Sequence, residues 1–263
     1  MRAYYIKKRH LKSVALALSC IAVWMFVAIF ADFGVLPTMS SDPIYSGSET
    51  GGMASFAINV DWGEEYIPDM LDLFDEKDIK VTFFLTGRWT DKNPDLAREI
   101  VRRGHEIGNH AYSHKSPNSM SQEENQKEIQ RTAAVIKTVT GVDTMLYAPP
   151  SGERESQVLA AAAAEHHVTI LWSVDTIDWQ KPSVATMQER VLTKAKPGCI
   201  ILMHPTENTL AALPGMIEQL QERGLTLGTV SATCRLEQLP AEEPQPESKN
   251  KSNQPLQPLV PRY

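Results

Sequence analysis

Residues 80–86 read KVTFFLT, a short run that is apolar or uncharged at every position after the first. A strand with one solvated face alternates apolar and polar residues, whereas a strand covered on both faces of a parallel sheet is continuously apolar. The length of this run suits a strand better than a helix. Residues 80–86 are therefore predicted to form a buried strand of a parallel sheet.

The same kind of run recurs on both sides of it. Strands are expected at 55–60, 80–86, 105–110, 144–148, 168–175, 199–204 and 226–231. Amphipathic helical patterns lie between them at 65–76, 94–103, 122–139, 154–166, 184–195 and 208–223. Such alternation predicts an α/β layer or barrel, and the strand count suits a barrel short of the usual eight. An open doubly wound sheet is the alternative, although no glycine-rich phosphate loop follows the first strand.

The composition divides the chain into four parts. Residues 1–33 hold a basic N-terminus and an apolar run from 14 to 31, residues 34–53 read as a linker, 54–236 as the domain, and 237–263 as a disordered Pro-rich tail. The apolar run approaches the length of a membrane-spanning helix, and its basic flank places the rest of the chain outside the cell. We expect a single-pass anchor in the cell membrane. A cleaved signal peptide is the alternative, but Ile29-Phe30-Ala31 is a poor cleavage site.

Charge and cysteine content narrow the class of protein further. The net charge of −6 argues against a nucleic acid partner, which needs a basic footprint. The chain has 3 cysteines, too few for a disulfide scaffold. Cys199 and Cys234 lie near predicted core strands and are expected to be buried free thiols, with a bridge between them as the alternative.

Polar side chains follow the predicted strands at their carboxyl ends, where function collects in parallel α/β folds. These residues are Asp61, His110, His114, Pro149, Pro150, Asp175, Asp178, Trp179 and His204. Carboxylates, imidazoles and an indole that converge on one rim are hard to attribute to packing. The rim is therefore the candidate site.

The histidines at this rim suggest metal and acid chemistry. His110 and His114 are four residues apart, so a helical turn after the strand would let them share a divalent ion such as zinc. Asp61 could be a general base or an oxygen ligand, or simply the cap of the following helix. His204 could donate a proton to a leaving group or be a hydrogen-bonded core histidine. Asp175 and Asp178 could orient it and hold it protonated, or could be turn and cap residues.

Aromatic side chains lie near the same rim. Trp62, Tyr147 and Trp179 suggest stacking on sugar rings, although aromatic residues at strand ends are commonly part of the packing.

In this order the motifs resemble those of the polysaccharide deacetylases with the NodB homology domain, a carbohydrate esterase family. The resemblance covers about residues 54–236 and includes VTFFLTG at 81–87 and GHEIGNH at 104–110. It implies a distorted (β/α)7-type barrel and a metal-dependent hydrolase that removes acetyl groups from N-acetylated cell-wall or spore glycan. By this resemblance His110 and His114 match the metal histidines, Asp61 the base, His204 the acid, and Asp175 the residue that tunes it. Trp62, Tyr147, Pro149, Pro150 and Trp179 would contact the glycan.

Two positions depart from the family pattern. The motif Thr-Phe-Asp-Asp-Gly appears as Asn59-Val60-Asp61-Trp62-Gly63, so an indole replaces the metal-binding carboxylate. In the Arg-Pro-Pro-aromatic-Gly motif, Ala148 stands where the arginine is expected. Two histidines leave a tetrahedral ion half unsupported, so Asp61 would have to join them as a ligand. The resemblance therefore implies a weak or inactive deacetylase.

Three functions remain open. The first is a metal-dependent deacetylase that uses Asp61, His110, His114 and His204, and the second is a non-catalytic glycan-binding or assembly domain on the same fold. The third is a membrane interaction protein that works through its Pro-rich tail.

Overall fold

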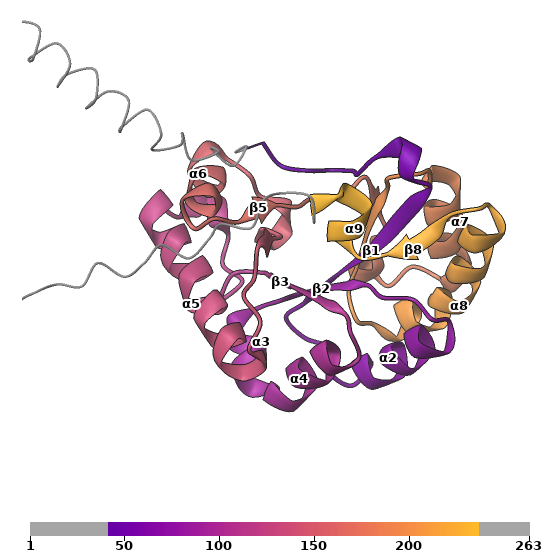
Figure 1. Ribbon diagram of the computed structural model, residues 1–263, viewed down its shortest axis with the longest axis horizontal. Helices are drawn as coiled ribbons and strands as arrows, with labels where there is room; N and C mark the ends of the chain where they lie inside the picture. Colours follow the sequence, from indigo (N-terminus) through magenta and orange to yellow (C-terminus); the bar gives the residue numbers. More distant parts are fainter. Residues whose placement is uncertain (1–41, 237–263) are drawn as a thin grey trace, which may run out of the picture.

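The computed structural model describes residues 42–236. At its centre lies one sheet of parallel strands in the order β5-β4-β3-β2-β1-β7-β6, with β8 beside β1 (Figure 1). The strands are β1 (Met53–Val60), β2 (Thr82–Leu85), β3 (Glu106–Asn109), β4 (Leu146–Tyr147), β5 (Val168–Thr169), β6 (Val174–Asp175), β7 (Ile200–Met203) and β8 (Thr226–Gly228). The α/β expectation is confirmed, in the form of a half-barrel of parallel strands with helices around it.

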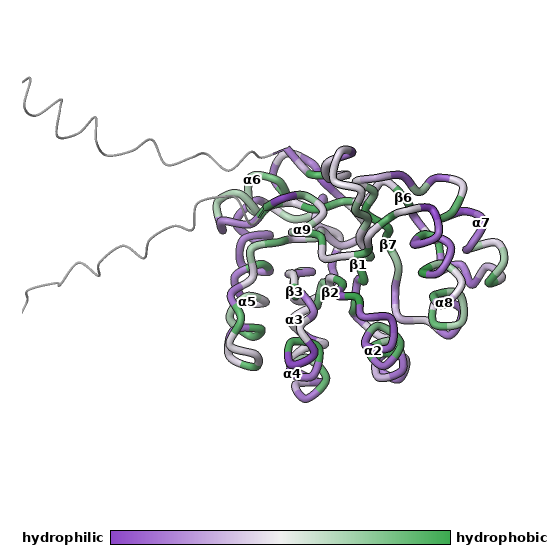
Figure 2. Tube along the Cα trace, turned by 45° about the vertical axis from the view of Figure 1, so that its right-hand side comes forward, coloured by the Kyte–Doolittle hydropathy of each residue, from purple (hydrophilic) through white to green (hydrophobic). Residues whose placement is uncertain are grey.

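Helices cover the outside of this sheet. They are α2 (Ile67–Glu76), α3 (Gly87–Lys92), α4 (Pro94–Arg102), α5 (Gln122–Thr140), α6 (Ser156–Ala164), α7 (Val184–Lys194), α8 (Glu207–Glu222) and α9 (Val230–Cys234). In Figure 2 the strands are mainly hydrophobic and the outer helices are largely hydrophilic. The longest helix, α5, begins with a capping box between Ser121 and Glu124, a motif that satisfies two backbone N–H groups at the helix start.

The strand expected at 168–175 is wrong as one continuous strand. Residues 168–175 form β5 and β6, because β5 pairs with β4 at one edge of the sheet and β6 pairs with β7 at the other. The chain between them crosses from one edge to the other, and the N–H of Leu171 donates to Ile44 at 2.8 Å. The described part of the sheet therefore has eight strands instead of seven.

The end of the expected linker contacts the domain. Ile44 bridges to Ile170, next to β5, and Ser46 bridges to Cys199, next to β7, so residues 44–46 connect two parts of the sheet. Cys199 and Cys234 are free thiols, and burial raises the pKa of Cys234 to about 11.

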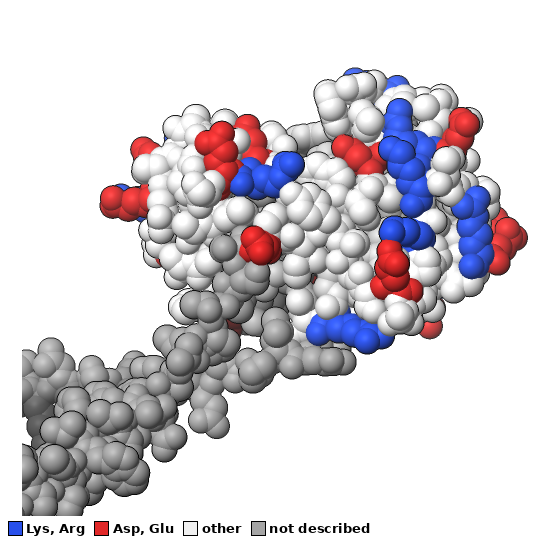
Figure 3. Space-filling view, turned by 90° about the horizontal axis from the view of Figure 1, so that it is seen from above, with Lys and Arg blue, Asp and Glu red and all other residues white. Residues whose placement is uncertain are grey.

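The expected membrane anchor at 14–31 and the tail at 237–263 lie outside the described residues. No helix between residues 42 and 236 is long and apolar enough to span a membrane. On the face drawn in Figure 3, Lys and Arg side chains gather toward one end, with Asp and Glu side chains beside them.

Candidate functional site

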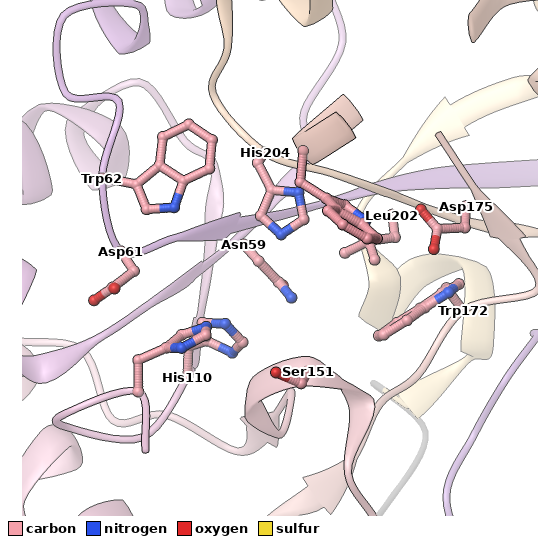
Figure 4. Close-up of a pocket in the computed structure, with 11 residues that line it drawn as sticks. Asn59, Asp61, Trp62, His110, Ser151, Trp172, Asp175, Leu202 and His204 are labelled. Atoms are coloured by element: carbon pink, nitrogen blue, oxygen red, sulfur yellow. The ribbon is translucent and has the colours of Figure 1, made fainter. Parts of the chain in front are cut away.

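A cleft of about 460 Å³ opens at the carboxyl ends of the strands. Its walls come from β1, β6, β7 and from the loops that follow β1, β3, β4, β5, β6 and β7, and most of the residues that line it are labelled in Figure 4. They are Asn59, Asp61, Trp62, His110, His114, Ser151, Trp172, Asp175, Trp179, Leu202 and His204. Asp61, Trp62, His110, His114, Asp175, Trp179 and His204, all predicted from the sequence, therefore meet in one place.

The Asp61 carboxylate is bound by an arginine from a different element. Arg88, in α3, donates from Nε to Oδ1 at 2.6 Å and from Nη2 to Oδ2, while Thr86 donates to Oδ1 at 2.9 Å. Burial raises the pKa of the Asp61 carboxyl, but the hydrogen bonds from Arg88 and Thr86 outweigh it and leave the pKa below its ordinary value. Both oxygens of Asp61 are thus engaged by groups of the protein itself.

His110 and His114 lie in contact, with ring centroids 5.0 Å apart. No helical turn joins them, contrary to the expectation. The backbone instead bends through left-handed conformations at Ala111 (φ 59°) and at His114 (φ 54°). Glu128 of α5 fixes this bend, because its Oε2 accepts hydrogen bonds from the N–H groups of Tyr112 and Ser113.

The inner histidine of this pair has a defined orientation. His110 is 1% exposed, and its Nδ1 lies 2.6 Å from the carbonyl oxygen of Ala148. A carbonyl only accepts, so Nδ1 carries the proton and Nε2 is left as the acceptor. Burial lowers the pKa of His110 to about 3, which keeps the ring neutral near neutral pH.

The partner of His204 is Asp178, not Asp175 as the resemblance suggested. The Asp178 carboxylate lies 2.8 Å from His204 Nδ1 and also accepts the His204 N–H at 2.6 Å. Asp178 is 1% exposed and receives a third hydrogen bond from the Thr209 hydroxyl. Asp175 instead accepts the N–H of Ile177 at 2.8 Å within its own turn. The contact with Asp178 leaves Nε2 of His204 on the cleft side of the ring, without a hydrogen-bond partner among residues 42–236 (Figure 4).

Trp62 occupies the position next to Asp61 and covers the same imidazole. Its ring stacks on His204 with centroids 5.9 Å apart and an angle of 7° between the planes. Gly63 follows it at φ +84°, and a Cβ there would lie 2.1 Å from the carbonyl oxygen of Pro205. This close approach holds the loop after β1 against the residue that follows His204.

The donor set does not fit the metal that the resemblance implies. Asp61 lines the cleft with His110 and His114, but Arg88 and Thr86 engage its carboxylate. The Trp62 indole offers only a hydrogen-bond donor. Within residues 42–236 no group of three or more His, Cys, Asp or Glu side chains is placed to hold a metal ion. Two imidazoles do not complete a tetrahedral zinc site.

Three of the residues expected to contact glycan do not line the cleft. Tyr147 is 1% exposed and packs with Ile129 and Val158 in the core, and burial raises the pKa of its hydroxyl. Pro149 and Pro150 lie in the loop after β4 and are buried. Their neighbour Ser151 lines the cleft because its backbone is left-handed, at φ 57°.

Sequence reasoning also missed three further residues of the cleft, Leu202 of β7, Trp172 and Asn59. Trp172 was expected within a continuous strand, and only the break between β5 and β6 lets it line the cleft. Asn59 lies near the end of β1, 5% exposed, and its buried Oδ1 has no partner among the described residues. The available signal was the position of Asn59, which lies one residue before the end of a strand and within a motif that forms the cleft.

Residues 49–170 match the family model described as polysaccharide deacetylase. The Bacillus subtilis protein YlxY is 41% identical over 196 residues, which cover 74% of this chain and 61% of YlxY. A Bacillus cereus peptidoglycan-N-acetylglucosamine deacetylase is 32% identical over 193 residues, covering 71% of this chain and 70% of that protein. The chain thus spans about three fifths of the length of YlxY.

Solved structures show the same fold. A CE4 family pseudoenzyme from Bacillus anthracis superposes with a TM-score of 0.73 at 39% identity, covering 74% of this chain and 69% of the other. A mutant of that pseudoenzyme, described as having restored enzymatic activity, gives the same TM-score at 38% identity, covering 74% of this chain and 72% of the other. The half-barrel is thus shared by proteins with and without enzymatic activity.

Proposed function

Because the chain belongs to the polysaccharide deacetylase family, we propose that its cleft binds an N-acetylated cell-wall glycan and that any hydrolysis it performs is weak or absent. The observation that carries this proposal is the contact of Arg88 with both oxygens of Asp61. The hydrogen bonds from Arg88 and Thr86 lower the pKa of Asp61 and so make it a weaker base, and the adjacent guanidinium repels a metal cation. Trp62 supplies no carboxylate in its place.

The shape and chemistry of the cleft support a glycan as the ligand. Trp62, Trp172 and Trp179 provide flat apolar surfaces around it, and sugar rings stack on such surfaces through their C–H faces. The unpartnered Oδ1 of Asn59 is a buried acceptor available to a hydroxyl or amide N–H of a ligand. The related proteins include peptidoglycan-N-acetylglucosamine deacetylases.

A weak deacetylase is the second candidate. It is favoured by the hydrogen bond between His204 Nδ1 and Asp178, which would orient the imidazole for proton transfer. His110 also supports weak deacetylase activity, because its ring is neutral and its Nε2 is left as an acceptor. Loss of a free general base costs on the order of 10²–10⁴ in rate, so residual activity would be slow.

A direct comparison separates the two candidates. Purified full-length chain is mixed with N-acetylglucosamine oligomers, and binding, metal content and released acetate are measured across a series of divalent ions. The proposal expects saturable binding, acetate release at least about 100-fold slower than that of the Bacillus cereus relative, and less than one metal ion per chain. Acetate release that approaches the rate of that relative and is abolished by His110→Ala would identify an enzyme instead.

We also propose that the domain lies outside the cell, anchored by residues 14–31, where it would meet wall or spore glycan. The proposal rests on the basic residues before this run and its length. Protease added to intact cells should digest the domain when the chain is complete. It should spare the domain only in cells in which the chain lacks residues 1–33. Full protection of the intact chain would place the domain inside.

A further inference from the structure

A second cavity adjoins the cleft on the far side of two tryptophans. It measures about 260 Å³ and is lined by Trp62, Glu65, Tyr66, Asp178, Trp179, Lys181, Thr206, Glu207 and Asn208. Trp62 and Trp179 also line the main cleft, so the two hollows share a wall made of indole rings. A ligand that is longer than one ring could therefore lie in both.

These two indoles are kept on the surface. Trp62 is 45% exposed and Trp179 is 57% exposed, although burying an aromatic side chain is favourable by about 2 kcal/mol. Exposed aromatic side chains that border hollows on both sides are typical of a binding surface. The rings therefore offer their free faces to a ligand instead of to the core.

The backbone around Trp179 is arranged to hold it there. Trp179 lies in the short 3-10 turn Asp178–Gln180, and the residues on either side of this turn, Ile177 (φ 53°) and Lys181 (φ 55°), are both left-handed. Each such residue costs on the order of 1 kcal/mol and persists where the surrounding structure imposes it, often at ligand sites. Buried Asp178 anchors the turn through its bonds to His204.

The rest of the second cavity is polar with both donors and acceptors. Glu65 and Glu207 offer carboxylate oxygens and Lys181 offers an ammonium. Saccharides present the matching pattern, because each hydroxyl both donates and accepts while the ring faces are apolar. An apolar ligand would leave these groups unsatisfied.

From these observations we infer a second saccharide subsite in this cavity, so that the chain binds two neighbouring rings of a glycan strand on either side of Trp62 and Trp179. The inference rests on the proposed glycan-binding function and adds where the neighbouring ring lies. It also gives Trp62 a role. The indole stands in place of a carboxylate that would bind a metal, and it provides a stacking surface between the two subsites.

The test is the dependence of affinity on glycan length. Isothermal titration of the full-length chain with N-acetylglucosamine oligomers, from monomer to pentamer, should show affinity that rises by about tenfold when the oligomer becomes long enough to enter both cavities. The double variant Glu65→Ala/Lys181→Gly removes two side chains that line the second cavity and do not line the main cleft. Glycine accepts the left-handed backbone at position 181, so this variant is expected to fold.

In the double variant the gain with length should fall to less than about threefold, while the affinity for the monomer is unchanged. Trp179→Ala, which alters both cavities, should weaken every oligomer. A length gain that the double variant leaves intact, or equal affinity for all lengths in the wild type, would overturn the second subsite while leaving glycan binding in place. Absence of binding at every length would overturn the proposed function along with it.

Discussion

Arg88 binds both carboxylate oxygens of Asp61, so a guanidinium from the helix after β2 neutralises the acid at the end of β1. In the family motif an arginine after the fourth strand would be the steadying cation, but Ala148 stands there. The counter-charge has thus moved to a different element of the fold. It binds both oxygens of Asp61, which opposes the use of Asp61 in place of the metal-binding carboxylate that Trp62 replaces.

Arg88→Ala should release Asp61 and raise the pKa of its carboxyl toward the ordinary value, because hydrogen bonds from Arg88 are what lower it. Carboxyl NMR titration measures the change. The half-exposed ion pair should also contribute about 1 kcal/mol to the free energy of unfolding at neutral pH. Since the folded pKa is depressed, this contribution is present above about pH 4 and is lost as the pH falls through the folded pKa.

Arg88→Lys is the matched control for this prediction. It keeps the charge but loses the bidentate geometry, so the pKa of Asp61 should recover only in part. An unchanged pKa in both variants would contradict the role given to Arg88.

The alanine variants of Asp178 and Asp175 should differ in their free energy of unfolding. Asp178→Ala should lower the free energy of unfolding by about 2–4 kcal/mol, because it leaves three hydrogen-bond donors near a buried site without their acceptor. Asp175→Ala removes one hydrogen bond of a partly exposed turn and should cost about 1 kcal/mol or less. Urea denaturation of both variants measures the difference. Equal costs would contradict the assignment of Asp178 as the partner of His204.

The sequence predicted the fold and most of the cleft because both depend on local patterns. Apolar runs such as the one at Thr82–Leu85 became strands, and the polar residues that follow them met at one rim. Trp172 was missed because a strand break depends on which edge each half pairs with, and that is a long-range property.

Arg88 was missed, and Asp178 was not told apart from Asp175, for a similar reason. Arg88 lies 27 residues from Asp61, and no spacing rule links the two. Asp175 ends β6, whereas Asp178 follows the left-handed Ile177, and it is the Asp178 carboxylate that contacts His204. Backbone conformations of this kind leave little trace in residue type.

Stability should also depend on a histidine outside the cleft. His105 is buried against Phe74 and Phe83, and burial lowers its pKa to about 4. In the unfolded chain its pKa is about 6.5, so the unfolded state binds more protons between these values. The free energy of unfolding should therefore fall by about 1–2 kcal/mol as the pH drops from 7.5 to 5. His105→Phe should flatten this part of the profile in pH-dependent denaturation, and an unchanged slope would contradict it.

Trp62→Asp should convert the cleft into a metal site. The new carboxylate would join His110 and His114 as a third donor, which is the set that two imidazoles alone fail to complete. Elemental analysis and titration with Zn²⁺ should show close to one ion per chain in this variant and much less in the wild type. Trp62→Ala is the control, since it removes the indole without adding a donor. Acetate release should remain slow in Trp62→Asp and should increase when Arg88→Ala is added, because loss of the Arg88 hydrogen bonds raises the pKa of Asp61 and makes it a stronger base. Full metal content in the wild type, or in Trp62→Ala, would show instead that the two histidines bind the ion without a third side chain.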